Sequence, residues 1–345
     1  MIDWAYVAVP ILVLPIVLLF RFVGCTPFSG QTGASQTGNG NTVPTGPIQL
    51  PGPPDYRNYL MGVTPNPGTL KDPSPVSPND IIAYWRLVNQ PSSGLAADEK
   101  GIYNGNYVQV PGGILTTLVP SLINATPNDR KDSCSNFQGG YVEVPYKDGL
   151  YDGLAAGDFT IECWINAQWN QSTPIGQRTL FFAGGHYQSP SEFAAQYNVF
   201  RVYADESNHW KVDVYPNPTP IKPTPTPVIL KPDISVTFGA TTYLVVTLQK
   251  NALGLIDVFL WINGQKLSSS ATSNTSLLDC AAPIGAPLLI GVANDSTADP
   301  QLASSTVIPT QPILSEIQEV VFYRRALTQA EITTHYELNS PTGGY

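Results

Sequence analysis

The stretch Asp158 to Asn166 reads Asp-Phe-Thr-Ile-Glu-Cys-Trp-Ile-Asn. From Phe159 to Ile165 every second residue is apolar and suited to a core, and the residues between are Thr, Glu and Trp. A period of two places alternate side chains on opposite faces of a strand. The stretch therefore predicts a β-strand with one face turned toward a hydrophobic core.

Four further segments have strand character, and with the first they predict an all-β domain. They are residues 242–249, 257–262, 288–292 and 317–323. Asn263-Gly264 follows the second of them and predicts a tight hairpin, because both residue types tolerate positive φ. The proline-rich segment 216–232 cannot enter a central strand and is expected to form an extended surface loop.

One soluble helix is expected, after the last strand. Thr328 and Glu331 form the Thr-x-x-Glu pattern of a capping box, and Leu327 and Ile332 are spaced for a hydrophobic staple. The helix is predicted to end near Tyr336.

Composition limits the classes of function. Only 12% of the 345 residues are charged, whereas Gly (29) and Pro (33) are plentiful, which argues against a helix-rich protein. The net charge of −9 argues against a nucleic-acid partner, which would be held through Lys and Arg contacts to phosphates.

The N-terminal region 1–24 contains an uncharged, mostly apolar run from Trp4 to Phe20. At about 1.5 Å per helical residue, this run is just long enough to cross a bilayer. We interpret it as a membrane anchor helix. Two alternatives stay open: a lipoprotein signal with lipidation at Cys25, and a cleaved signal or buried helix. The side of the membrane stays open, although we expect the downstream domain to be extracytoplasmic or part of a virion.

A linker and a large domain follow the anchor. In residues 25–79, 35 of 55 residues are Gly, Pro, Ser, Thr or Asn, a composition that predicts an extended linker. Residues 80–345 are predicted to form the β domain. Cys163 shares the parity of the core-facing residues, so a buried free thiol is expected, and a bridge from Cys163 to Cys134 stays open.

The order of the segments resembles the laminin-G-like (LamG) family of concanavalin A-like jelly rolls. The matching segments are 82–87, 97–98, 136–145, 158–165, 178–182, 259–265, 289–291 and 316–332. The resemblance implies a sandwich of two antiparallel sheets over about residues 80–338. The family includes lectins, adhesion modules, receptor-binding domains, viral structural proteins and glycoside hydrolases, so fold alone does not decide function.

Catalysis is not expected. Glycosidases need two carboxylates beside a sugar-binding cleft. The Glu-x-Asp-x-(x)-Glu run that is common among hydrolases of this superfamily does not occur in the sequence, and Glu316 and Glu319 should point to opposite faces of a strand. Of the three scattered histidines, His335 is placed on the terminal helix, in a solvated or packing role. We therefore predict a protein that is not an enzyme and requires no cofactor.

Calcium is the metal that the resemblance implies, at one edge of the sandwich. The candidate ligands are Asp98, Asp295 and Asp299, all in predicted loops. The alternative is that these carboxylates cap turns and face water.

Glycan recognition would use exposed aromatic rings together with amide groups. Trp169 and Tyr187 are the aromatic candidates, and Asn294 is the amide candidate. The tryptophans at 85, 164, 210 and 261 lie in strand patterns and are expected in the core or on a sheet face.

Two hypotheses for function follow, with hydrolysis as a remote alternative. In the first, the chain is a membrane-anchored structural or accessory subunit whose sandwich contacts other proteins of a larger assembly, either a cell-envelope complex or a membrane-containing virion. In the second, it is a surface lectin or adhesin that binds glycans.

Overall fold

The fold is described from a computed structural model. The chain divides into the units Met1–Gln49 and Leu50–Tyr345, and every residue that the structure describes belongs to the second. The described residues are 60, 76–88, 94–123, 133–169, 176–187, 195–214, 228–232, 234–272, 287–294 and 307–339. No helix within these ranges is both long and apolar enough to cross a membrane. The predicted anchor and nearly all of the predicted linker lie outside the described residues.

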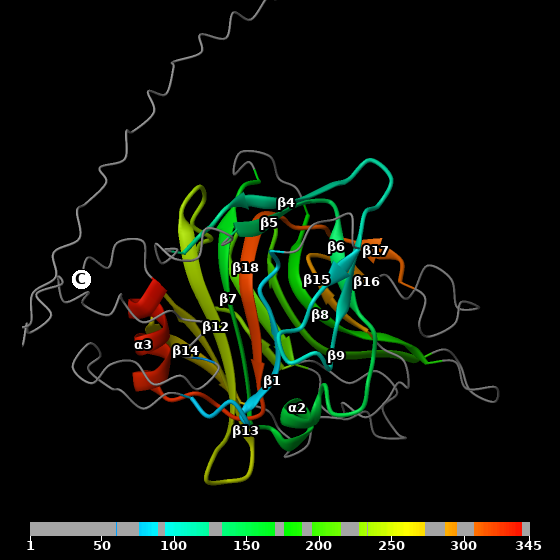
Figure 1. The fold of residues 1–345 in the computed structure, drawn as a ribbon. Coiled ribbons are helices and arrows are strands. Elements are labelled where there is room, and N and C mark those ends of the chain that lie inside the picture. Colours follow the sequence, from blue (N-terminus) through cyan, green and yellow to red (C-terminus); the bar gives the residue numbers. More distant parts are fainter. Residues whose placement is uncertain are drawn as a thin grey trace, which may run out of the picture. The chain divides into compact units, whose positions relative to one another are not determined.

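The first large sheet, here called sheet A, has eight strands (Figure 1). Their order is β14-β13-β12-β7-β18-β5-β4, and β1 pairs with β18. The strands are β1 (Ile81–Trp85), β4 (Ile114–Pro120), β5 (Ser133–Gln138), β7 (Phe159–Ala167), β12 (Thr241–Lys250), β13 (Ile256–Ile262), β14 (Gln265–Thr272) and β18 (Leu314–Tyr323).

The second large sheet, sheet B, also has eight strands, in the order β11-β10-β9-β8-β15-β6-β3-β2. They are β2 (Leu95–Ala96), β3 (Gly105–Val108), β6 (Tyr141–Val144), β8 (Arg178–Tyr187), β9 (Ala195–Ala204), β10 (Trp210–Val214), β11 (Val228–Leu230) and β15 (Leu288–Ile290). A small ribbon joins β16 (Ala293–Asn294) to β17 (Pro309–Thr310). The pairs within both sheets are antiparallel, which confirms an all-β fold of two antiparallel sheets, consistent with a jelly-roll sandwich.

The main hydrophobic core lies between the two sheets. Phe159 and Phe322 of sheet A and Phe200 of sheet B meet there edge to face, with ring centroids 5.1 Å apart for Phe159–Phe322 and 6.0 Å apart for Phe159–Phe200. Edge-to-face contacts at these separations are favourable beyond the area they bury. The strand that the sequence predicted at 158–166 is β7, and its alternate apolar residues do face this core.

A second cluster covers the outer face of sheet A. Here Trp164 of β7 and Tyr243 of β12 stack at 4.8 Å beneath Tyr336 of the terminal helix. The centre of sheet A is therefore buried on both faces. This explains why almost every residue of β7 is buried, although its sequence alternates as if one face met water.

The predicted terminal helix is α3 (Gln329–Asn339), three residues longer than expected, and it packs against sheet A (Figure 1). A short helix that was not predicted, α2 (Asp152–Ala156), precedes β7. Its C-cap residue is Gly157, which adopts the left-handed conformation at φ +78° that favours glycine.

The two described cysteines, Cys134 and Cys163, are not joined by a disulfide. Cys163 lies in the core between the sheets, whereas Cys134 lies in the cluster on the outer face of sheet A. Side chains on opposite faces of one sheet cannot form a disulfide without backbone movement, so the bridge that the sequence left open is not made.

Candidate functional site

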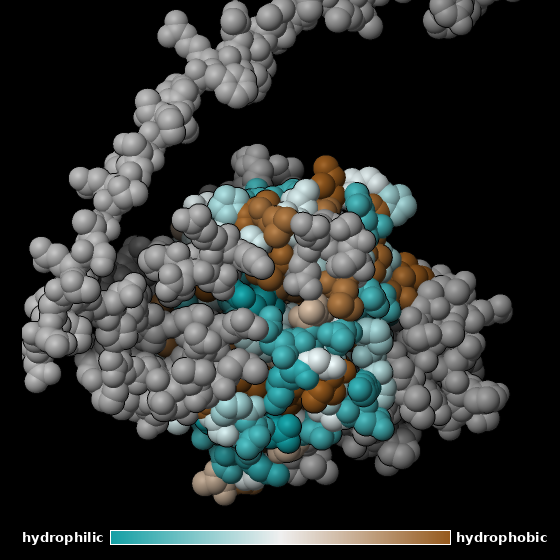
Figure 2. All heavy atoms as spheres, in the orientation of Figure 1, coloured by the Kyte–Doolittle hydropathy of each residue, from teal (hydrophilic) through white to brown (hydrophobic). Residues whose placement is uncertain are grey.

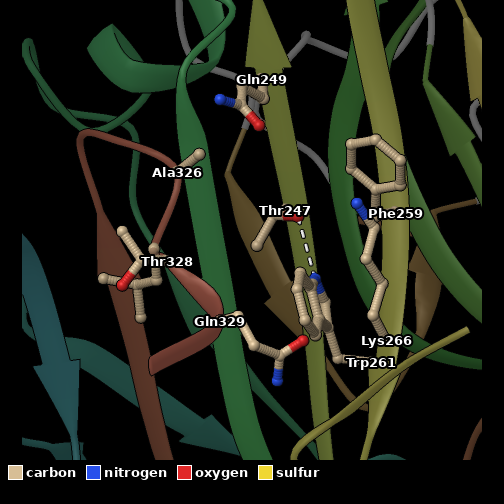
Figure 3. Close-up of a pocket in the computed structure, with 9 residues that line it drawn as sticks. Thr247, Gln249, Phe259, Trp261, Lys266, Ala326, Thr328 and Gln329 are labelled. Atoms are coloured by element: carbon tan, nitrogen blue, oxygen red, sulfur yellow. Dashed lines mark hydrogen bonds between the residues drawn. The ribbon is translucent and has the colours of Figure 1, made fainter. Parts of the chain in front are cut away.

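A cavity of about 270 Å³ opens on the outer face of sheet A, next to the start of α3 (Figure 3). Thr247 and Gln249 of β12, Phe259 and Trp261 of β13, and Lys266 of β14 line one side. The opposite rim is formed by the turn before α3 and the first residue of that helix. The cavity volume lies just below the range of about 300–1,000 Å³ that is usual for small-molecule sites, which suits a single small ring.

The aromatic wall of the cavity comes from alternate residues of β13. Phe259 and Trp261 share one face of the strand, and Phe259 lies directly across from Thr247 of β12. The indole Nε1–H of Trp261 donates to Thr247 Oγ1 at 3.0 Å, so the wall is held by an internal bond (Figure 3). Lys266 lies across from Trp261, with its Nζ 3.4 Å from the ring centroid of Phe259, a cation–π contact.

The polar groups at the rim are amides and a hydroxyl. Gln249 lines the cavity from β12 and Gln329 lines it from the start of α3, where Thr328 precedes it (Figure 3). The amide Nε2–H of Gln329 donates to the carbonyl of Gly264 at 2.8 Å and to the hydroxyl of Thr333 at 2.9 Å. Because these donors are used, Gln329 offers its carbonyl oxygen to a ligand, and Gln249 offers both ends of its amide.

The β13–β14 hairpin positions this rim. Asn263 and Gly264 have φ of 51° and 75°, as the Asn-Gly signal predicted, and the carbonyl of Gly264 accepts the bond from Gln329. The predicted capping box is also present. The backbone N–H of Thr328 donates to Glu331 at 2.8 Å, and the backbone N–H of Glu331 donates to the Thr328 hydroxyl at 3.3 Å.

An ion-pair network fixes the turn before α3. Arg325 donates to Asp80 at 2.7 Å and to Glu331 at 2.6 Å and 2.9 Å. Burial by itself would raise the pKa of Glu331, but the bonds from Arg325 and Thr328 outweigh it and lower that pKa to about 2.

A fully buried acidic network lies behind α3. Glu162 of β7 accepts hydrogen bonds from the hydroxyls of Tyr243 and Tyr323, the second at 2.5 Å, and lies 3.0 Å from Nδ1 of His335. Burial tends to raise the pKa of Glu162, but the charge of His335 and the three bonds together lower it. His335 therefore has a packing role and not a solvated one.

A second buried carboxylate lies on the same face. Glu319 accepts from the hydroxyl of Tyr84 and lies 3.3 Å from Nε of Arg86. A β-bulge lies between Gln318 and Val321, and Glu319 has φ of 54°. The extra residue turns the Glu319 side chain to the outer face of sheet A. The Glu316 side chain lies on the same face, where it accepts a hydrogen bond from the Asn166 amide. The expectation that Glu316 and Glu319 lie on opposite faces was therefore wrong.

The structure places the predicted glycan-binding residues apart from the cavity. Trp169 is buried, packs edge to face on Phe238 at 5.3 Å and donates its indole N–H to Asn208 at 2.8 Å. Asn294 is also buried, and its side-chain oxygen accepts the backbone N–H of Ile308. Tyr187 is the last residue of β8, and its side chain lies outside the description. Trp169 and Asn294 thus serve internal contacts, and the expected exposed ring at 169 is not found.

Asp98, a predicted calcium ligand, is buried and bonded to the backbone. Its two carboxylate oxygens accept the N–H groups of four residues, Tyr84, Lys100, Ile102 and Tyr103, at 2.9–3.1 Å. These donors occupy the oxygens that a calcium ion would need, so the arrangement is that of a turn cap. Asp295 and Asp299 lie outside the described residues, as does Cys25. In the part of the chain that is described, no three His, Cys, Asp or Glu side chains gather as a metal site.

The sequence did not mark the cavity residues as a site, although two local signals specify the elements that carry them. Asn263-Gly264 fixes the register that brings Lys266 beside Phe259 and Trp261, and the capping box locates the start of α3. The two signals lie far apart in sequence, and only the packing of α3 on sheet A brings them to one site.

The chain belongs to the concanavalin A-like lectin/glucanases superfamily, whose family model matches residues 136–333. No curated protein sequence matches the chain.

Solved structures of similar fold are distant. A Trypanosoma rangeli sialidase in complex with 2,3-difluorosialic acid is 17% identical at a TM-score of 0.48, over 81% of this chain and 37% of the sialidase. Domain 4 of AbnA, a GH43 extracellular arabinanase from Geobacillus stearothermophilus in complex with arabinotriose, is 16% identical at 0.41, covering 74% of this chain and 98% of that domain. The receptor-binding domain of botulinum neurotoxin type G is 12% identical at 0.41, over 75% and 51% of the two chains. The assignment rests on the family model.

Proposed function

We propose that the sandwich is a carbohydrate-binding module without catalytic activity and that the cavity beside α3 is its glycan site. The observation that carries the proposal is the combination of the Phe259–Trp261 wall with the amides of Gln249 and Gln329 at one opening. Sugar rings bind by packing an apolar face against aromatic carbon while their hydroxyls exchange hydrogen bonds with polar side chains. The wall and the rim supply both kinds of contact.

Binding without hydrolysis is supported by the chemistry of the lining. Glycoside hydrolysis uses two carboxylates beside the scissile bond. None of the nine residues drawn in Figure 3 is acidic. The buried carboxylates of Glu162 and Glu319 do not line this cavity and already accept bonds from tyrosines.

A glycan array tests this proposal with the full chain and two variants. Gln249→Ala removes an exposed amide from the opening, and we expect a loss of about threefold to tenfold in affinity, corresponding to one hydrogen bond. Gln168→Ala is the matched control, because Gln168 is a glutamine outside the cavity, bonded to Gln138. An array on which the unmodified chain binds no glycan would overturn the proposal.

In a second candidate function the chain is a membrane-anchored accessory subunit in a larger assembly, and the edge strand β4 supports the protein-contact part of it. Its Ile114 and Leu118 are 56% and 52% exposed, and Figure 2 shows apolar atoms gathered at the top of the view, where Figure 1 places β4. An exposed edge strand offers unpaired backbone groups to another protein. Co-purification from membranes or virions in a fixed stoichiometry, lost in Ile114→Lys, tests this candidate. Recovery as a dispersed membrane protein contradicts it.

A further inference from the structure

We propose that the cavity beside α3 selects an anionic sugar residue, and that Lys266 is the group that recognises its negative charge. The inference rests on the proposed glycan binding and adds the class of ligand. It follows from the charge of the lining, the surroundings of the Lys266 ammonium and the hydrogen bonds of two carboxylates on the bordering elements.

The lining is cationic in an acidic protein. The chain has 26 acidic and 17 basic residues and a net charge of −9. Among the nine residues of Figure 3, by contrast, Lys266 is the one ionisable side chain. A cavity whose charge opposes that of the whole chain favours ligands that the rest of the surface repels.

The Lys266 ammonium has donors to spare. Its Nζ lies 3.4 Å from the ring centroid of Phe259 and 5.4 Å from that of Trp261, so two aromatic faces hold it at the cavity. Within the described residues no carboxylate forms an ion pair with it, whereas nearby Arg325 is paired with both Asp80 and Glu331. An ammonium has three N–H donors, and those that do not face the aromatic rings are available to an anion.

Two carboxylates on the elements that border the cavity have hydrogen-bond partners of their own. Glu331, in the first turn of α3, is held by Arg325 and Thr328. Asp257 precedes Phe259 on the same face of β13, and it accepts bonds from Asn251 at 3.1 Å and Thr272 at 2.7 Å. Neither lines the cavity, so neither occupies the place beside Lys266 that an anionic group of a ligand would take.

The effect should appear as selectivity between ligands of the same shape. An exposed ion pair contributes up to about 1 kcal/mol, equivalent to about fivefold in affinity, and salt screens it. The matched ligands are trigalacturonate and its methyl ester, which differ in charge. A sulfated galactose trisaccharide shows whether a sulfate ester serves as well as a carboxylate.

The test is calorimetric titration of the full chain in a detergent without a sugar headgroup. We expect trigalacturonate to bind about fivefold more tightly than the ester at low salt, with the difference shrinking at high salt. Lys266→Gln should abolish the difference and Lys266→Arg should retain it. The matched control is Lys250→Gln, which removes the same charge from an exposed lysine of β12 that does not line the cavity.

The outcomes separate the two proposals. Equal binding of acid and ester overturns the selectivity and leaves glycan binding standing. If Lys266→Gln and Lys250→Gln reduce the affinity difference between acid and ester equally, the role of Lys266 is overturned, because the effect then comes from net charge at long range. No binding of any of the three ligands overturns the selectivity, and a blank glycan array overturns glycan binding with it.

Discussion

Nδ1 of His335 lies 3.0 Å from Oε2 of Glu162, and both side chains are fully buried between α3 and the centre of sheet A. The contact ties the C-terminal helix to β7. Because the first residue of α3 forms part of the cavity rim, the pair also fixes one side of the candidate glycan site.

Glu162→Ala should destabilise the domain strongly. The substitution leaves the hydroxyls of Tyr243 and Tyr323 and the ring of His335 without their shared acceptor in a buried site. Breaking a buried pair in this way costs about 3–5 kcal/mol in the free energy of unfolding, measurable by urea denaturation. The control is Glu316→Ala on the same face, where one hydrogen bond to Asn166 is lost and about 1 kcal/mol is expected. Similar losses in the two variants would contradict a special role for Glu162.

Stability should fall in acid. The pKa of Glu331 is about 2 in the folded chain and that of Glu162 is also lowered, whereas an unfolded glutamate titrates near about 4.3. Folded-state values below the unfolded one mean that these groups stabilise the fold above about pH 4.3 and lose that contribution as the pH falls toward the folded values. Thermal melts between about pH 6 and pH 2 should show a falling Tm, with a shallower slope in Glu331→Gln. If Tm falls with the same slope in Glu331→Gln, Glu331 is excluded as a source of the acid sensitivity.

Local patterns predicted five of the strands, the hairpin and the helix start. Alternation located β7, Asn263-Gly264 located the turn, and Thr328 with Glu331 located α3. Each signal lies within a few residues of the element that it specifies, so no knowledge of tertiary packing was needed.

Contacts between distant residues explain what the sequence did not predict. Glu162 and His335 are separated by 173 residues, and no local pattern pairs them. The bulge at Glu319 turns its side chain to the same face as Glu316. It lies where one edge of β18 stops pairing with β5 and begins to pair with β1, and no local pattern predicts that change of partner. Trp169 follows a strand and looked exposed, but Phe238 and Asn208 from other parts of the chain cover it.

Asp98→Ala should destabilise the fold to the same extent with and without calcium. The Asp98 carboxylate accepts four backbone N–H groups, and its removal leaves buried donors unsatisfied. The loss of hydrogen bonds to a charged group predicts that the free energy of unfolding decreases by at least about 2–3 kcal/mol. Chemical denaturation in calcium and in a chelator should give the same decrease. A decrease seen only with calcium would instead assign Asp98 to a metal site.

Trp169→Ala and Trp261→Phe should separate stability from glycan binding. Trp169 is buried in the core, so its truncation should cost about 3–5 kcal/mol in unfolding free energy, while the folded fraction keeps its glycan affinity. Trp261→Phe keeps an aromatic ring but loses the bond to Thr247 and part of the cavity wall, so affinity should fall about tenfold, the equivalent of about 1.4 kcal/mol. Calorimetric titration alongside urea denaturation distinguishes the two effects. If Trp169→Ala instead abolishes binding by protein that remains folded, the glycan site lies at Trp169 and not beside α3.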